Sequence, residues 1–374
     1  MWSKIVYIRA LISRFVFGTS SIHGMKYQQL LPSTTYATEQ FGMLCLEEEN
    51  YKYPVKIKRS SCNCGHHLQP EFGYGCVVDG VVSGDGRVFD RRHRLVSESV
   101  ASHHQPQYAS NPGILRTRKA SQKSGCALNL NWWSGNISFY HWNRDVFSRA
   151  FVVTALDPST QLNVVIPPNR LPFQEYALNQ LSMIYGNIHL IEQHLGEWTR
   201  YDEVVVPRCN STDVGSGFLH PEVADFIRSV NFYNIPETTE KVPVLYISRA
   251  KASRRRLLDE GLLIERLSRI VPLKVVSIED FSYVEQMRLM SGVGVLVGPF
   301  GAGLTNILFT KRLALVEIHN SDSRETHFAT LSLACKSRYV QIRGGRSDLY
   351  QDFYLGQLGI DAVCKAVTSE ISVL

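Results

Sequence analysis

The sequence predicts an α/β protein with two domains, each built on a parallel sheet. Short apolar strands alternate with helical stretches of about 10–15 residues, and the alternation restarts after a linker at 234–243 with proline near both ends. The length of 374 residues also exceeds the roughly 250–300 at which single hydrophobic cores stop growing. We therefore expect two Rossmann-like domains facing a cleft, behind a β-rich N-terminal extension.

The expected domain boundaries follow the changes in pattern. Residues 1–125 form an extension with β-hairpins and a basic linker, 126–236 the first Rossmann-like domain, and 237–374 the second, which ends in a C-terminal helix. In the extension, Asp79-Gly80 and Asp85-Gly86 are turn dipeptides between β-branched runs and predict hairpins. The polar, basic segment 102–125 reads as the linker.

Each domain has its expected elements in chain order. The first should contain strands, a helix, two more strands and a helix, at 151–156, 163–167, 171–186, 187–192, 202–207 and 221–230. The second should alternate strand and helix at 244–248, 254–270, 273–278, 282–292, 293–298, 302–309 and 313–318.

The composition excludes several classes of protein. Hydrophobic residues make up 44% of the chain, which excludes a wholly disordered or fibrous protein. A net charge of +6 over this length is too mild to indicate nucleic-acid binding, and local cation clusters facing a small anionic ligand explain it better. Eight cysteines are too sparse for a disulfide scaffold, and they permit bridges without requiring them.

The N-terminal 21 residues allow three explanations. Lys4, Arg9 and Arg14 interrupt the apolar residues, so the segment falls short of the ~18–20 uncharged residues of a membrane span. It can be a core helix, a basic helix at a membrane surface, or a poor signal peptide. We expect a cytoplasmic protein, with peripheral contact at the inner membrane face through this helix as one alternative.

The glycine-rich segment at 293–309 is the sharpest chemical signal. A strand ends at Gly298, a loop holds Gly301 and Gly303, and a helix begins near Thr305 or Asn306. Unpaired N–H groups at a helix start suit a diphosphate, although a tight turn with packing glycines is the alternative. Val297 stands where a dinucleotide fingerprint needs its third glycine, which argues against a nicotinamide oxidoreductase.

A basic cluster follows the expected strand at 244–248. Arg249 stands at the carboxyl end of that strand, where parallel sheets bind ligands, and planar guanidinium groups suit phosphate oxygens. A solvated helix face is the alternative for the arginine triplet. The five cations of the cluster are Arg249, Lys251, Arg254, Arg255 and Arg256.

Three further residues are candidates for chemistry. Glu317 lies inside an apolar strand, so it needs a partner, which a ribose diol, an arginine or a core ion pair would provide. His141 and Asp145 stand at i, i+4 of an expected helix, as a general base with its orienting carboxylate or as a structural pair.

Two absences narrow the chemistry. No Asp-x-Asp pair is present for a divalent metal on a nucleotide diphosphate, and no Gly-x-Ser-x-Gly elbow for a serine hydrolase. A possible zinc cluster lacks a spaced second half, so we expect no metal site. Its residues are Cys62, Cys64, His66 and His67, with Cys76 beyond them.

Four segments, in this order and spacing, resemble glycosyltransferase family 61: ISRAKASRRRLLDE, FSYVEQMRLMSG, GPFGAGLTNILF and LVEI. FYHWNRDVFSRAF, in the looser N-terminal half, is similar to the family's helix with His and Asp four residues apart. The family includes capsule and exopolysaccharide proteins, xylosyltransferases and N-acetylglucosaminyltransferases. The resemblance implies a GT-B architecture, in which 126–236 binds the acceptor and 237–374 the nucleotide-sugar.

The resemblance also implies roles for single residues. His141 and Asp145 would face the acceptor as catalytic residues, and Glu317 would lie near the nucleotide ribose. The donor diphosphate would contact the basic cluster and the glycine loop. These donor-binding residues are Arg249, Lys251, Arg254, Arg255, Gly298, Phe300, Gly301, Ala302, Gly303 and Asn306.

One position departs from the family pattern. The family usually has histidine where this chain has Phe300, and a phenyl ring can stack or fill space but donates no hydrogen bond. The expected function is an inverting, metal-independent transfer from a nucleotide-sugar, as a UDP-sugar, to a glycan or polysaccharide, without a cofactor or nucleic acid. The alternative is a degenerate family member that binds nucleotide or glycan without transfer.

Overall fold

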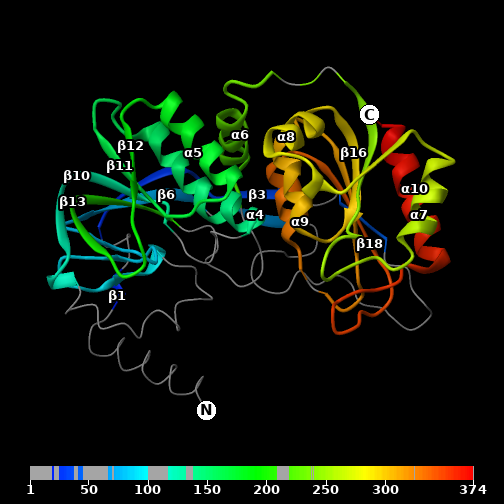
Figure 1. Ribbon diagram of the computed structural model, residues 1–374, viewed down its shortest axis with the longest axis horizontal. Coiled ribbons are helices and arrows are strands. Elements are labelled where there is room, and N and C mark those ends of the chain that lie inside the picture. The colour runs from blue at the N-terminus through cyan, green and yellow to red at the C-terminus, as the bar shows by residue number, and fades with distance from the viewer. Residues whose placement is uncertain are drawn as a thin grey trace, which may run out of the picture. The chain divides into compact units, whose positions relative to one another are not determined.

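The computed structural model describes residues 19–20, 25–37, 41–44, 66–69, 71–99, 117–131, 138–208, 219–236, 238, 240–323 and 325–373. They divide into two compact units: unit 1 is Met1–Thr34 with Pro70–Tyr233, and unit 2 is Thr35–Gln69 with Asn234–Leu374. Figure 1 shows the elements of each. The expected N-terminal helix and the cysteines Cys62 and Cys64 lie outside the described residues.

Unit 1 is built on a mixed ten-stranded sheet. Its main path runs β1-β9-β8-β7-β13-β10-β11-β12, and β6 pairs with both β13 and β2. The strands after residue 120 pair in parallel, whereas β6 and β7 run antiparallel to β13. The strands are β1 (Thr19–Ser20), β2 (Lys26–Leu31), β6 (Phe72–Val78), β7 (Val81–Ser83), β8 (Val88–Phe89), β9 (Leu95–Val96), β10 (Ser121–Asn129), β11 (Leu162–Ile166), β12 (Ile188–Glu192) and β13 (Trp198–Pro207).

Two long helices of unit 1 begin at proline, whose fixed φ suits a first helical position. They are α5 (Pro172–Ile184) and α6 (Pro221–Asn231). An irregular helical run precedes them, consisting of α4 (Phe139–His141), a π-helical turn η4 (Trp142–Val146) and the 3₁₀ segment η5 (Phe147–Ala155), and η2 (Ser97–Ser99) is a further 3₁₀ turn.

The prediction of a strand at 151–156 is wrong, because these residues belong mostly to η5. Its apolar side chains pack on α6: the ring centroids of Phe151 and Phe226 are 5.6 Å apart, edge to face. A short apolar run cannot by itself separate a buried strand from a buried helix. β11 pairs with β12 on one side and with β10 on the other, and the polar first half of β10 falls in the segment expected to be a linker.

One of the two expected hairpins is confirmed. Asp85-Gly86 joins β7 and β8, which pair antiparallel. At Asp79-Gly80 the chain does not reverse. It continues in the same direction from β6 to β7, because both strands pair antiparallel with β13. The Asp79 N–H donates to the carbonyl oxygen of Asp202 at 3.0 Å, and its φ of 53° marks a local kink rather than a reversal.

Unit 2 contains a six-stranded sheet in which every pairing is parallel. Helices α7 and α10 cover one face, and α8, η7 and α9 cover the other (Figure 1). In sheet order the strands are β15 (Leu273–Val276), β14 (Val242–Ile247), β16 (Val293–Pro299), β17 (Ala314–His319), β18 (Arg338–Arg343) and β4 (Phe41–Leu44).

The helices of unit 2 are mostly where the sequence predicts them. The helical elements are η6 (Ile278–Asp280), α7 (Glu260–Ser268), α8 (Tyr283–Ser291), η7 (Ala302–Phe309), α9 (His327–Ala334) and α10 (Gly356–Ile371). A two-stranded ladder, β3 (Thr34–Ala37) with β5 (His66–Gln69), lies outside the main sheet. The strands β18 and β4 and the helix α9 are not among the expected elements.

The helix expected from 254 begins only at Glu260, so the arginine triplet lies in a loop and not on a helix face. Arg255 adopts a φ of 59°, and its N–H donates to the carbonyl oxygen of Tyr350 at 3.0 Å. Arg256 is tied to Asp352 by its backbone N–H at 2.7 Å and by its guanidinium. These bonds to the segment before α10 replace the first helical turn.

The strand order of unit 2 indicates where a ligand would bind. β14 lies between β15 and β16, so the chain leaves β14 toward one edge of the sheet and then returns past it to the other side. Open parallel sheets bind ligands at the carboxyl ends of the strands where the order reverses in this way. The switch point of unit 2 lies between β14 and β16.

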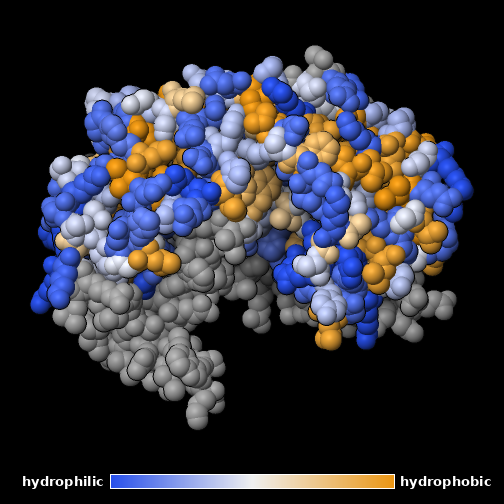
Figure 2. Space-filling view, in the orientation of Figure 1, coloured by the Kyte–Doolittle hydropathy of each residue, from blue (hydrophilic) through white to orange (hydrophobic). Residues whose placement is uncertain are grey.

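Hydrophilic residues cover much of the face shown in Figure 2, and hydrophobic ones gather in separate places. Within the described ranges, no helix has the length and apolar character needed to cross a membrane.

Candidate functional site

A pocket opens at the switch point of unit 2. Its empty space is about 290 Å³ when the open mouth is included. The lining comes from the carboxyl ends of β14 and β16, from the start of η7 and from η6. The lining residues are Ile247, Ser248, Arg249, Ala252, Ile278, Glu279, Pro299, Gly301, Gly303 and Leu304.

Arg249 is fixed in this pocket by the loop that follows it. Nη2 donates to the carbonyl oxygen of Arg254 at 2.9 Å, and Nε donates to that of Arg255 at 3.2 Å. Burial lowers the pKa of Arg249, and the charge of Arg254 lowers it further, although an arginine keeps its charge. An anionic ligand would restore the solvation that this guanidinium has lost.

The glycines of the loop allow it to pack closely against its neighbours. A Cβ at Gly298 would lie 2.9 Å from the carbonyl oxygen of Ile247, and one at Gly303 would lie 3.0 Å from Cγ2 of Ile278. Glycine at these positions therefore lets β16 and η7 approach their neighbours closely, while exposed Ala302 begins η7.

Asn306 is buried and holds the start of η7 in place. Its Nδ2 donates to the carbonyl oxygen of Gly303 at 2.9 Å and to Oε1 of Gln286 at 3.2 Å. Asn306 does not line the pocket, so the observed geometry gives it a supporting position behind the loop.

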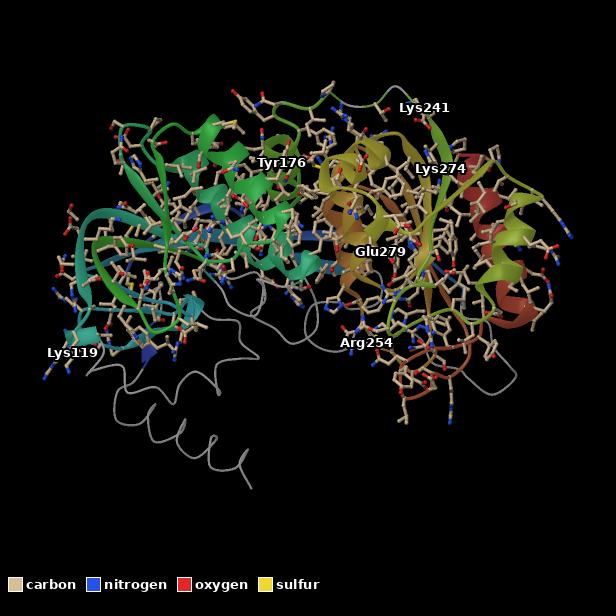
Figure 3. The ribbon with its side chains drawn as sticks, viewed as in Figure 1. Lys119, Tyr176, Lys241, Arg254, Lys274 and Glu279 are labelled. Atoms are coloured by element: carbon tan, nitrogen blue, oxygen red, sulfur yellow. The ribbon has the colours of Figure 1, made fainter. Side chains whose placement is uncertain are left out.

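The other predicted cations surround the pocket but do not line it. Lys251 forms an exposed ion pair with Asp280 at 2.6 Å, and Arg255 Nε donates to Oε1 of Gln351 at 2.8 Å. Figure 3 labels Arg254, on the loop after β14, and Glu279, on the turn after β15.

Phe300 lies beneath Arg255. The guanidinium carbon of Arg255 is 5.0 Å from the centroid of the Phe300 ring, a cation–π geometry. On other sides the ring packs against His319, at 4.5 Å between centroids, and His327, at 5.9 Å. Burial lowers the pKa of His319 to about 3, so this imidazole is neutral.

Glu317 is buried in the middle of the sheet. Its carboxylate accepts hydrogen bonds from the hydroxyl of Tyr339 and, at 3.4 Å, from Nε2 of Gln341. Burial raises the pKa of Glu317 to about 7. It does not line the pocket, so its expected position near a ribose remains a prediction.

Two acidic residues of the site were not singled out from the sequence. Glu260 is buried and accepts from Oγ of Ser248 at 2.7 Å and from the N–H of Arg249 at 3.1 Å, which fixes the end of β14. Glu279 lines the pocket itself. Both look like ordinary surface glutamates in the sequence, because their importance comes from which strand ends meet.

His141 and Asp145 form the second candidate site, in unit 1. Nδ1 of His141 lies 2.7 Å from Oδ2 of Asp145, and the Arg144 guanidinium contacts Oδ1 of the same carboxylate at 2.6 Å. Asp145 is fully buried, whereas the imidazole of His141 is 37% exposed. The i, i+4 pairing predicted from the sequence is confirmed.

The electrostatics of this pair keep Asp145 ionised. Burial alone would raise its pKa, but the charge of Arg144 and the hydrogen bond from His141 hold the pKa below its ordinary value. A carboxylate that accepts from Nδ1 leaves Nε2 as the proton acceptor of a neutral imidazole. The arrangement can therefore remove a proton from a hydroxyl.

Among the described residues, no group of three or more His, Cys, Asp and Glu side chains is placed to hold a metal ion. Of the cysteines in the described ranges, Cys126 and Cys364 are free thiols.

Comparison with known protein families gives a match that spans parts of both units. Residues 139–316 match the family model described as Glycosyltransferase 61, a range that includes His141, Asp145, Arg249 and the glycine loop. A comparison with curated proteins gives no match. Residues 139–316 are a glycosyltransferase family 61 domain, and the protein is a glycosyltransferase.

Proposed function

We propose that the protein is an inverting, metal-independent glycosyltransferase that moves a sugar from a UDP-sugar to a glycan or polysaccharide hydroxyl. The observation that carries this proposal is the pocket at the β14/β16 switch point, where Arg249 lies beside a glycine loop. A guanidinium next to glycines suits a diphosphate. The proposal includes a GT-B arrangement, with unit 2 as the donor half and unit 1 as the acceptor half.

In the proposed reaction the acceptor oxygen attacks the anomeric carbon from the face opposite the diphosphate. The bond between that carbon and the phosphate oxygen breaks, and its electron pair leaves with the nucleoside diphosphate. Nε2 of His141 takes the proton of the attacking hydroxyl, while Asp145 orients the ring and stabilises its charged form. The buried Asp145 is thus a positioning residue.

Arg249 supplies the stabilisation that the departing diphosphate needs. Its guanidinium is held by two backbone carbonyl groups before any ligand arrives, so little reorganisation is required as charge develops. In other transferases a divalent cation can take this role. Here we assign it to Arg249, to the nearby arginines and to the first N–H groups of η7.

The direct test is release of UDP from a panel of UDP-sugars (xylose, N-acetylglucosamine, glucose and galactose), with and without EDTA. The proposal predicts turnover of at least one donor, unchanged by EDTA, and inversion at the anomeric carbon in the product. Turnover abolished by EDTA and restored by a divalent cation would disprove the metal-independent mechanism. Retention of the anomeric configuration would disprove the single displacement.

A second candidate function is binding of a nucleotide or glycan without transfer. Phe300 favours it, because the ring contacts Arg255 but offers no hydrogen bond to a phosphate or sugar. UDP binding without turnover, together with turnover gained by Phe300→His, would support this second candidate.

A further inference from the structure

Two side chains of opposite charge share the pocket of unit 2. Arg249 lies against Gly301, and Glu279 lies on η6, the turn that follows β15. Burial lowers the pKa of Arg249, and the negative charge of Glu279 is the largest of the neighbouring effects that oppose this shift. A ligand that fills the pocket therefore meets a cation and a carboxylate together.

The carboxylate of Glu279 is available to such a ligand. Within the described part of the chain it forms no hydrogen bond or ion pair, and its side chain is exposed. The neighbouring acids are already engaged: Asp280 pairs with Lys251 at 2.6 Å, and Glu260 accepts from Ser248 at 2.7 Å. Glu279 is the acid that the pocket itself presents.

A carboxylate accepts hydrogen bonds and repels phosphate, so Glu279 suits the uncharged, hydroxyl-bearing part of a ligand. A ribose offers two adjacent hydroxyl donors. The topology also separates a phosphate side from a ribose side of the pocket. The glycine loop follows β16 and Glu279 follows β15, and these two strands lie on either side of β14. In other parallel sheets an acidic side chain beyond the phosphate-binding strand accepts a ribose hydroxyl.

We propose that Glu279 recognises the ribose of the donor, accepting hydrogen bonds from its 2′- and 3′-hydroxyls while Arg249 binds the diphosphate. The inference rests on the proposed function, since it takes this pocket as the nucleotide site. Glu279 would then make the ribose contact that the sequence analysis expects of Glu317. Glu317 itself is buried and hydrogen-bonded to Tyr339.

The test is calorimetric titration of UDP and of 2′-deoxy-UDP into the full chain and into Glu279→Ala. The unchanged chain should bind UDP about tenfold more tightly than 2′-deoxy-UDP, because a hydroxyl-to-carboxylate hydrogen bond is lost. Glu279→Ala should weaken UDP binding by about 10- to 100-fold and abolish the preference for the ribose. The control Glu265→Ala, an exposed acid of α7 paired with Arg269, should change neither.

Each other outcome overturns the inference in a recognisable way. A Glu279→Ala variant that still prefers UDP over its deoxy analogue would disprove the ribose contact and leave the nucleotide site standing. Weaker binding of UDP-sugars with unchanged binding of UDP would place Glu279 against the sugar instead. If the unchanged chain bound no UDP at all, the proposed function would fail together with the inference.

Discussion

The guanidinium of Arg249 lies so close to Gly301 that a Cβ built on this glycine would come 2.0 Å from Nη1. The backbone of Gly301 is extended, so any residue could adopt its conformation. Glycine is needed there because Arg249 occupies the space of a side chain. The loop and the arginine thus depend on each other, and the remaining features of the pocket can be tested around this pair.

Gly301→Ala should displace Arg249 without unfolding the protein, because the obstructing atoms are the end of a flexible side chain. We expect kcat to fall on the order of 10²-fold, approaching the effect of losing one charge-stabilising donor, and the melting temperature to change little. Gly261→Ala is the matched control, since nothing lies within 4 Å of a Cβ there and alanine favours a helix. Full activity of Gly301→Ala would show that Arg249 has no catalytic role.

His141→Ala should lower kcat by about 10²–10⁴-fold, the usual contribution of a general base. The ring is 37% exposed, so the variant should remain folded. Asp145→Asn should also lower kcat, and the double variant should lose little more than His141→Ala alone, because the two side chains act as a unit. Strictly additive losses would argue against a coupled pair.

The stability of Asp145→Asn separates its two roles. The substitution leaves the buried Arg144 without its counter-charge, so we expect a loss of about 3–5 kcal/mol in the free energy of unfolding. Urea denaturation measures this loss, and kinetics should be compared at a temperature where both proteins are folded. A fully stable Asp145→Asn would contradict the buried ion pair.

Glu317 should make stability depend on pH. Its pKa is raised by burial from 4.5 to about 7, so its favourable contribution is complete below about pH 4.5 and is lost as the pH rises through 7. A shift of this size corresponds to roughly 3 kcal/mol. Comparing urea unfolding at pH 5 and pH 8 for the unchanged chain and for Glu317→Gln should show the pH-dependent loss only in the former. An equal loss in both proteins would assign it to other groups.

Phe300→Leu should weaken donor binding by removing the aromatic face beneath Arg255. A cation–π contact that is not fully desolvated contributes about 0.5–1 kcal/mol, so the Kd for UDP should rise about two- to fivefold. The effects of Phe300→Leu and Arg255→Ala should be less than additive if the ring acts through that guanidinium. Additive effects would mean that Phe300 supports the loop independently of Arg255.

Much of unit 2 could be predicted from the sequence, because its strands are apolar runs bounded by loops. The strands β14, β16 and β17 and the helix α8 lie where the alternation predicts them. In unit 1 the same criteria failed at 151–156, since the apolar residues of η5 pack on α6 and carry no strand period. β10 was missed because its first half is polar and exposed.

The parts of the candidate site that depend on local sequence could be predicted. Arg249, Gly301 and Gly303 meet in one pocket because they follow adjacent strands, and His141 meets Asp145 because four residues make one helical turn. Glu279 could not be found in this way. Glu279 lies at the pocket because β15 pairs beside β14. This strand order depends on the whole sheet and cannot be predicted from the residues around Glu279.

Calorimetric titration of UDP into the unchanged chain, Arg249→Ala and Arg269→Ala tests the central claim most directly. Arg269 is an exposed arginine directly after α7, paired with Glu265, so its removal controls for the loss of one positive charge. The account predicts UDP binding to the unchanged chain and to Arg269→Ala, and binding weakened at least tenfold in Arg249→Ala. Equal binding by all three proteins would show that the pocket between β14 and β16 is not the nucleotide site.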